Sequence, residues 1–208
     1  MVSNAALIDE LARLRIILTV LIGLTFAGCE KEEPPDYGKY APAKTIRDLN
    51  LAYNFRDPEL LAGLFDEDDF ELLPGTRPEG FPAEWGYDEE TAATGALLES
   101  AYTITFEMVS DDAYIGRARV DNTEYVTPWL DTRIRVYPDE YKALYARGRV
   151  RFTLRRGGPD EQWKIIRLED YTGPEYADVL EKPDTELTSW TAIKLSYLGV
   201  DTAEKRTE

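Results

Sequence analysis

Apolar residues in the first part of the chain recur at helical spacing. Ile46, Leu49 and Tyr53 fall on one face of a helix. Asp57-Pro58 places an aspartate cap before a proline, which predicts the start of a short second helix. Acidic residues are favoured at the positive end of a helix, so Asp88-Glu89-Glu90 predicts a third start. The expected elements are helices over 43–55, 57–65 and 88–100, with a short strand over 70–73.

After residue 101 the period of the pattern changes to two. Tyr102, Ile104, Phe106 and Met108 alternate with polar residues, which is typical of a half-buried strand. The turn sequence Gly157-Gly158-Pro159-Asp160 predicts a hairpin between two later strands. The expected strands cover 102–108, 116–126, 131–137, 147–156 and 162–171. Because helices precede strands, the sequence predicts an α+β fold with three N-terminal helices packed on one face of an antiparallel sheet.

The N-terminus has the pattern of an export signal. Arg13 and Arg15 precede the apolar run Ile16–Phe26, which is too short to span a membrane as a helix. The run leads into Ala27-Gly28-Cys29, and Cys29 is the only cysteine of the chain. This arrangement resembles a bacterial lipoprotein signal, which is cleaved before the cysteine that carries the lipid. The alternatives are an ordinary secretory signal with a chance cysteine, or an uncleaved anchor.

The lipoprotein interpretation predicts cleavage between Gly28 and Cys29 and lipidation of Cys29. The protein would then be lipid-anchored in the bacterial cell envelope on the extracytoplasmic side, either periplasmic or at the outer surface. The expected organisation is a signal peptide over 1–28, a flexible tether over 29–42, one domain over 43–173 and a tail over 174–208. The tail contains one more candidate helix near residues 187–198.

Charge and composition exclude several classes of site. The chain carries 40 acidic and 24 basic residues, a net charge of −16, and it has no histidine. Together with the single cysteine, this excludes Ser-His-Asp and Cys-His catalysis, histidine or cysteine metal sites and an internal disulfide. No glycine-rich phosphate loop occurs. We therefore expect no cofactor and no metal, and the negative charge argues against a nucleic-acid partner.

Two stretches carry a resemblance to a known family: TIRDLNLAYNFRDPELLAGLFDEDDFELLP at 45–74 and GRVRFTLRRGGPDEQWKIIRLEDYTG at 148–173. They resemble the NTF2-like (SnoaL-like, cystatin-like) domains, and more narrowly bacterial lipoproteins that carry one such domain. The resemblance covers about residues 43–198. It implies a curved sheet wrapped around helices and a conical pocket between them. It implies no single function, because such folds serve as isomerases, dehydratases, ligand binders and protein-interaction domains.

The resemblance directs attention to aromatic and acidic residues that could line the cone. The pocket candidates are Tyr53, Trp85, Tyr102, Trp163, Asp170 and Tyr171. Asp170 is the one candidate for acid–base chemistry, since an apolar cone can raise the pKa of a carboxylic acid into a useful range. In the alternative interpretation the aromatic residues are core packing and Asp170 is a hydrogen-bond partner at a strand end. No catalytic residue is assigned.

Two clusters of charged residues could each bind an ion or could have only a structural role. The acidic run Asp66–Asp69 lacks the glycine and distal glutamate of a calcium loop, so a solvated turn is favoured. A group of arginines alternates along two predicted strands and could form an anion-binding surface, or could pair with acids across an outer sheet face. The arginines are Arg133, Arg135, Arg149, Arg151 and Arg155, and the candidate acids are Glu107, Glu124 and Glu169.

Three functional hypotheses follow. The first is a lipid-anchored domain without catalysis that binds a small apolar or amphipathic ligand, or a protein partner. The second is an isomerase- or dehydratase-type enzyme that uses carboxylate and tyrosine chemistry. The third is a structural envelope protein whose cone is filled by its own side chains. Each of the three hypotheses is compatible with a homodimer.

Overall fold

A computed structural model describes residues 40–176 and 185–198. The chain divides into two units, residues 1–35 and 36–208, and the first lies outside the described part. The predicted signal peptide, its cleavage site at Gly28-Cys29 and most of the predicted tether therefore lie outside the described residues as well. The structural findings below concern the second unit.

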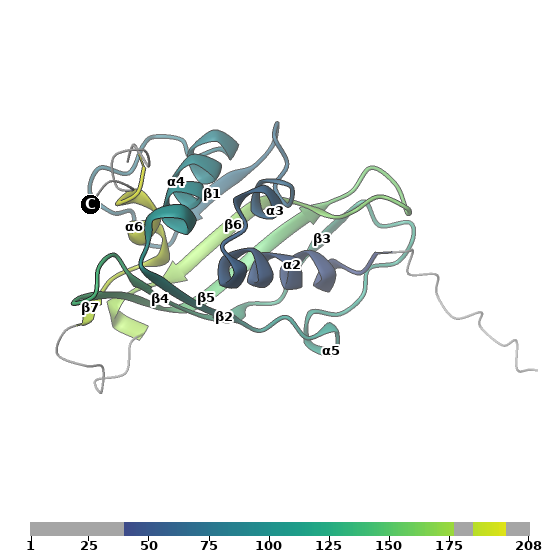
Figure 1. The fold of residues 1–208 in the computed structure, drawn as a ribbon. Helices are drawn as coiled ribbons and strands as arrows, with labels where there is room; N and C mark the ends of the chain where they lie inside the picture. Colours follow the sequence, from purple (N-terminus) through teal and green to yellow (C-terminus); the bar gives the residue numbers. More distant parts are fainter. Residues whose placement is uncertain (1–39, 177–184, 199–208) are drawn as a thin grey trace, which may run out of the picture. The chain divides into compact units, whose positions relative to one another are not determined.

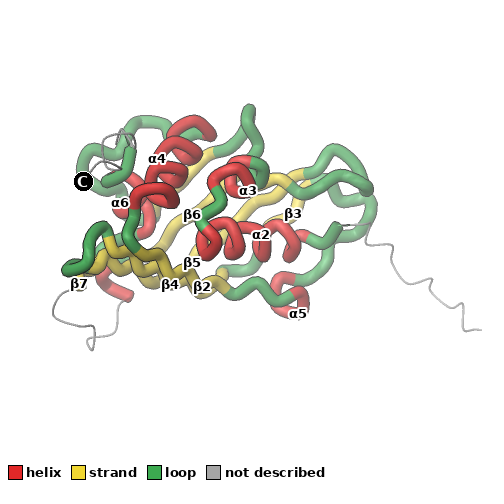
Figure 2. The backbone as a smooth tube through the Cα atoms, in the orientation of Figure 1, coloured by secondary structure: helices red, strands yellow, loops and turns green. Residues whose placement is uncertain are grey.

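The described residues form five α-helices and seven strands (Figure 1, Figure 2). The elements in chain order are α2 (Pro42–Phe55), α3 (Pro58–Ala62), β1 (Glu71–Pro74), α4 (Tyr87–Ser100), β2 (Thr103–Met108), α5 (Asp112–Ile115), β3 (Glu124–Val126), β4 (Leu130–Tyr137), β5 (Ala143–Arg155), β6 (Lys164–Thr172), the 3-10 helix η1 (Pro174–Tyr176), β7 (Thr185–Leu187) and α6 (Trp190–Leu195).

The strands form one mixed sheet with the order β1-β6-β5-β4-β2, and β3 and β7 also pair with β5. β1 runs parallel to β6 and β7 runs parallel to β5, whereas the other pairs are antiparallel. The prediction of a purely antiparallel sheet is therefore wrong at these two strands. A parallel neighbour needs a long connection instead of a hairpin, and the chain between β1 and β6 supplies one.

The helices cover one face of the sheet, here called the inner face (Figure 1). Even-numbered residues of β4 and β5, such as Ile134, Val150 and Phe152, point to this face and are fully buried. They join a single apolar core with residues of α2, α4 and α6. Odd-numbered residues of the same strands point to the opposite, outer face, which leaves that face open to solvent over the middle of the sheet.

Helix α2 lies along the free edge of β2 and satisfies its backbone. The Asn54 amide donates to the carbonyl of Phe106 at 2.9 Å and accepts from the Phe106 N–H at 3.2 Å. Asn50 Nδ2 donates to the carbonyl of Met108 at 2.8 Å. An unpaired strand edge invites association with another chain. The two asparagines satisfy part of that edge's backbone, so fewer of its groups are left for another chain.

Local sequence signals account for several element boundaries. The carboxylate of Asp57 accepts from the N–H of Leu60 at 2.8 Å, so it caps α3 as predicted, with Pro58 in the first turn. Helix α2 ends at Arg56, which adopts the left-handed conformation with φ 57°. Glu89 accepts from the N–H of Gly86 at 3.0 Å and closes the start of α4.

Three expectations need correction. Three helices precede β2 and the short strand β1 separates α3 from α4, as predicted, but the helix α5 after β2 was not expected. The predicted strand over 116–126 is reduced to β3, with α5 ahead of it. The predicted helix over 187–198 is shorter, because Leu187 ends β7, residues 188–189 have no regular structure and residues 196–198 form a turn. The Gly157–Asp160 turn does join β5 to β6, as expected.

Candidate functional site

The space between the inner face and the helices is occupied by α6. The indole of Trp190, which is 1% exposed, lies against two aromatic rings of the core. Its ring centroid is 5.5 Å from that of Tyr53 and 5.1 Å from that of Phe106. The indole N–H donates to the Tyr53 hydroxyl at 3.1 Å. A helix from the C-terminal tail thus places Trp190 against α2 and β2, on the side of the sheet where the family resemblance implied a conical pocket.

Asp170 holds α6 against the sheet. This carboxylate is 2% exposed on the inner face of β6. Its Oδ1 accepts from the N–H and hydroxyl of Thr172 at 3.0 and 2.7 Å. Its Oδ2 accepts from the N–H and hydroxyl of Thr191 at 2.8 and 2.5 Å. The N–H of Thr191 is in the first turn of α6, where free backbone donors favour an anion. Both oxygens are used, which matches the interpretation of Asp170 as a structural hydrogen-bond partner.

A second buried carboxylate binds α6 from the other side. Glu90 of α4 accepts from the ammonium of Lys194 at 2.8 and 2.9 Å. The indole N–H of Trp85 and the hydroxyl of Thr94 also donate to it, at 3.0 and 3.2 Å. The Lys194 ammonium lies 4.4 Å from the ring of Trp190 on its own helix. Both charges are therefore paired and hydrogen-bonded, as burial requires.

These charges act on the neighbouring phenol. Burial raises the pKa of Tyr53 well above its ordinary value, and the negative charge of Glu90 raises it further. Tyr53 is consequently a neutral hydrogen-bond donor and acceptor at physiological pH. It is not poised to act as a base.

The six predicted pocket residues do not surround one cavity. Tyr53, Trp85 and Asp170 lie around α6 and are buried. Trp163 is buried elsewhere in the core, where its indole N–H donates to the carbonyl of Tyr40 at 3.0 Å. The other two predicted residues are at the surface: Tyr102 is 61% and Tyr171 45% exposed. Tyr171 follows Asp170 on β6, so alternation places it on the outer face.

Two residues of this buried cluster were missed from the sequence. Lys194 lies on the same helical stripe as Trp190 and Tyr197, so a charged residue interrupts an otherwise apolar face. The lysine on this apolar face was the signal in the sequence for a buried ion pair, because a buried lysine needs a counter-charge. Glu90 was interpreted only as part of an acidic helix start. Nothing in the spacing connects it to a residue 104 positions away.

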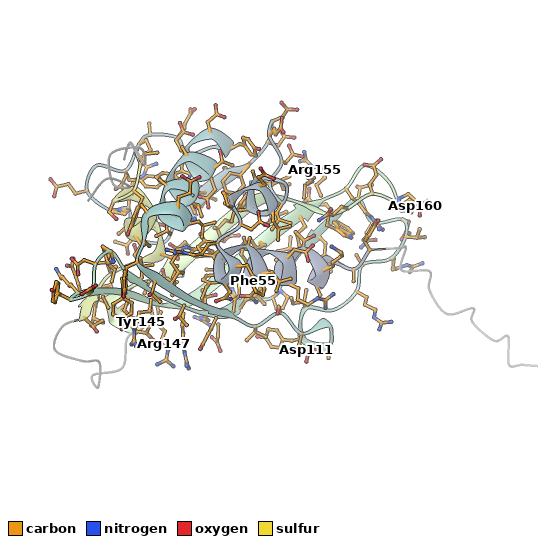
Figure 3. The ribbon with its side chains drawn as sticks, in the orientation of Figure 1. Phe55, Asp111, Tyr145, Arg147, Arg155 and Asp160 are labelled. Atoms are coloured by element: carbon orange, nitrogen blue, oxygen red, sulfur yellow. The ribbon has the colours of Figure 1, made fainter. Side chains whose placement is uncertain are left out.

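A groove of about 670 Å³ lies at the β2 edge of the sheet, where residues of α2, β2, β4 and β5 line it. Arg133 and Arg147 line it together with Glu107 and Asp131, and Asn50 borders it from α2. A smaller pocket of about 230 Å³ shares Glu107 and Arg133 and continues the groove toward Arg135 and Tyr145. The side chains of Tyr145 and Arg147 extend from the same side of β5 (Figure 3). We call the two depressions together the arginine groove.

Arginines of the outer face form ion pairs, and Arg133 pairs with Glu107, the acid opposite it on β2. Arg151 binds Glu169 through two hydrogen bonds of 3.0 and 2.7 Å, and its guanidinium lies 4.6 Å from the ring of Trp129. Arg155 pairs with Asp69, although its neighbour in the ladder is Glu124. The interpretation as a paired outer face therefore holds for this part of the sheet.

The acidic run Asp66–Asp69 has structural partners. One oxygen of Asp66 accepts from the N–H groups of Asp68 and Asp69 at 3.2 and 3.1 Å, and Asp69 pairs with Arg155. Within residues 40–176 and 185–198, no group of three or more acidic, histidine or cysteine side chains is arranged to hold a metal. None of the helices in the same ranges is long and apolar enough to cross a membrane.

Comparison with solved structures finds several proteins that this chain resembles. An NTF2-like superfamily protein from Salmonella enterica matches with a TM-score of 0.46 at 17% identity, covering 67% of this chain and 93% of that one. A cystatin-like domain of unknown function from Nostoc punctiforme matches with a TM-score of 0.42 at 16% identity, covering 61% and 72%. A candidate aromatic ring hydroxylase from Novosphingobium aromaticivorans matches with a TM-score of 0.50 at 14% identity, covering 74% and 94%.

The chain is thus similar to solved structures described as NTF2-like and as cystatin-like, the family that the sequence resemblance named. At these identities the likeness concerns the fold alone. No protein-family model matches the sequence, and neither does any curated protein compared with it.

Proposed function

We propose that this chain is a lipid-anchored, extracytoplasmic NTF2-like protein that acts without catalysis and binds a partner protein through the outer face of its sheet. The observation that carries the proposal is the position of α6. Trp190, Thr191 and Lys194 are buried against the inner face, where the family resemblance implied a conical pocket.

The buried carboxylates support a non-catalytic interior. Both oxygens of Asp170 accept two hydrogen bonds, and both oxygens of Glu90 face the ammonium of Lys194. A general acid or base must reach a reacting atom within hydrogen-bond distance. A substrate would have to displace Trp190 and Lys194 before it met either carboxylate. The surface available to a partner without such displacement is the outer face.

The anchor is carried over from the sequence. Lipidation at Cys29 would tie the domain to the membrane through the segment that precedes Tyr40, and at least two acyl chains give stable binding. The net charge of −16 would keep the domain itself off an anionic lipid surface. This combination suits a protein that reaches partners near the membrane.

Native mass spectrometry of protein extracted gently from its own host tests the proposal. We expect a chain that begins at Cys29, carries the mass of a lipid modification and holds no small molecule. A stoichiometric non-covalent mass of small-molecule size would contradict the filled cone. A chain without added lipid mass would contradict the anchor.

An enzyme remains the second candidate, because Asp170, Glu90 and Tyr53 gather around the same helix. If α6 withdrew, two carboxylates and a phenol would face one space, which suits isomerase- or dehydratase-type proton transfer. Incubation of the wild type and the Asp170→Asn variant with host metabolite extract separates the two candidates. A metabolite converted by the wild type and not by the variant would favour the enzyme. Identical metabolite profiles would favour the binding protein.

A further inference from the structure

Four side chains form one row across the outer face, from β1 to the start of β4. Glu169 of β6 is aligned with Leu73 of β1 on one side and with Arg151 of β5 on the other. Trp129, which directly precedes β4, continues the row, since the Arg151 guanidinium lies 4.6 Å from the centroid of its ring. We call Trp129, Arg151, Glu169 and Leu73 the outer row.

The two ends of the outer row are apolar and reach solvent. Leu73 is 42% exposed, and the ring of Trp129 is only partly buried. Tyr171, further along β6, is exposed as well, and its ring centroid lies 5.1 Å from that of Trp129. Val126 of β3 is exposed on the other side of the row. Aromatic and aliphatic side chains that gather around an arginine are typical of the centre of a protein–protein interface.

The charges in this part of the outer face balance within the chain. Arg151 donates to both oxygens of Glu169. The neighbouring rows each hold one arginine and one acid: Arg149 opposite Asp131, and Arg167 paired with Glu71. This region therefore has no net charge that would select a basic or an acidic partner. Because the chain as a whole carries a net charge of −16, a neutral face is where two copies can approach with the least repulsion.

The order of the outer row makes it complementary to itself. Across the sheet the row is apolar, positive, negative and apolar. When a second copy is turned over about an axis parallel to the strands, its row runs in the opposite direction. Glu169 of one copy then faces Arg151 of the other, and Leu73 faces Trp129. A twofold axis produces both halves of such an interface at once, and sheets commonly pack face to face with their strands nearly aligned.

From this geometry we propose that two copies of this chain associate through the outer faces of their sheets, with their outer rows packed against each other. A second copy is thus the partner for the outer face, so the inference rests on the proposed binding function. It does not depend on the lipid anchor or on the interior around α6.

Sedimentation equilibrium of the full chain, solubilised from membranes in a density-matched detergent, tests the proposal. We expect a reversible equilibrium between monomer and dimer. Leu73→Glu should raise the dissociation constant at least about a hundredfold, because it places an unpaired carboxylate against the ring of Trp129 in the other copy. Leu51→Glu is the matched control, since Leu51 is 43% exposed but lies on α2 instead of the sheet. Its dissociation constant should equal that of the wild type.

A charge exchange tests whether Arg151 of one copy faces Glu169 of the other. Arg151→Glu leaves two acids in the row and Glu169→Arg leaves two arginines, so each variant alone should be monomeric. In a mixture of the two variants the rows are complementary again, and we expect a dimer that contains one chain of each. A mixture of folded variants that stays monomeric would contradict the proposed facing. If either variant fails to fold, the comparison of Leu73→Glu with Leu51→Glu decides.

The remaining outcomes separate this inference from the proposed function. A wild type that stays monomeric at every concentration would overturn the inference and leave a different protein as the partner of the outer face. An equal loss of association in Leu73→Glu and Leu51→Glu would overturn it too, because it would indicate a general effect of added charge. A dimer that only Leu51→Glu disrupts would place the contact on another surface. Conversion of a metabolite would overturn the proposed function and leave this measurement unaffected.

Discussion

Lys194 and Glu90 form an ion pair that is closed to solvent on all sides. The ammonium lies 2.8 and 2.9 Å from the two carboxylate oxygens, and the side chains are 0% and 1% exposed. The pair connects α6 to α4 across 104 residues of sequence. Removing two charges from water is costly, and the indole of Trp85 and hydroxyl of Thr94 reduce that cost by completing the hydrogen bonds of Glu90.

Lys194→Met is expected to lower the free energy of unfolding by about 3–5 kcal/mol, because it leaves the Glu90 charge buried without a counter-ion. Urea denaturation measures the change. Lys142→Met is the control, since Lys142 pairs with Glu186 at the surface and both side chains are more than half exposed. That substitution should cost less than about 1 kcal/mol. An equal change in the free energy of unfolding in the two variants would contradict a larger contribution from the buried pair.

Asp170→Asn is expected to loosen α6 from the sheet. The neutral amide presents one acceptor oxygen in place of two, so the donors of Thr172 and Thr191 cannot all be satisfied, at a cost of about 1–3 kcal/mol. Hydrogen exchange should become faster at the amide of Thr191, while amides of β5 should change less. Asp160→Asn, in the exposed turn between β5 and β6 (Figure 3), is the control. Unchanged exchange in α6 would contradict the role assigned to Asp170.

Alkaline pH should destabilise the protein through its buried tyrosines. Burial raises the pKa of Tyr197 to about 12, whereas an unfolded tyrosine has a pKa of about 10. This contribution to stability is fully present below pH 10. Between pH 10 and 12 the unfolded state loses the proton first, so stability falls by up to ~1.4 kcal/mol for each pH unit. Tyr53, whose pKa is also raised, adds to the effect.

Thermal denaturation between pH 8 and 11.5 measures this dependence. Tyr197→Phe should flatten the decline above pH 10, because its phenol no longer titrates. Tyr141→Phe is the control, since the Tyr141 side chain is 81% exposed. Equal slopes for the wild type and Tyr197→Phe would contradict the assignment.

Gly148 and Gly95 should respond in opposite ways to alanine. Gly148 has φ +154°, and a Cβ there would lie 2.7 Å from the Cα of Thr172 on β6. We expect Gly148→Ala to cost roughly 1–3 kcal/mol through strain and displaced backbone. A Cβ on Gly95, inside α4, meets nothing within 4 Å. Gly95→Ala should therefore stabilise by roughly 0.5–1 kcal/mol. Chemical denaturation compares them, and a neutral Gly148→Ala would contradict the close β5–β6 contact.

Cys29→Ser tests the anchor in cells. Without the thiol no lipid can be attached, so the variant should leave the membrane fraction in carbonate or high-salt washes. Ser3→Ala, in the predicted signal peptide, controls for a general effect of substitution near the N-terminus. Membrane retention of Cys29→Ser equal to that of the wild type would contradict lipidation.

Much of the fold could be predicted because its signals are local. The stripe through Ile46, Leu49 and Tyr53, the cap at Asp57-Pro58 and the alternation in β2 each depend on residues within a few positions of one another. The same reasoning overextended the strand at 116–126, where only β3 is present. A short strand beside β5 is determined by its partner and not by its own pattern.

The candidate site was harder to predict because its contacts are distant in sequence. Asp170 was singled out, and its two interpretations could not be separated without knowing what lies opposite. The residue opposite Asp170 is Thr191, which donates two hydrogen bonds to it from a helix that the sequence analysis assigned to the tail. Tyr171 was predicted to line the same pocket as Asp170, although neighbouring residues of a strand point to opposite faces. This error could have been avoided from the sequence alone.

The sequence by itself determined the fold class, the order of most helices and strands, and the absence of histidine-based chemistry. These depend on composition and on short-range periodicity, which any single chain displays. Only the tertiary structure decided that Trp190 of α6 packs against Tyr53 and Phe106 and that Arg133 faces Arg147. Both depend on strand register and on packing between segments up to 137 residues apart. Such relationships are set by three-dimensional complementarity, which local patterns do not encode.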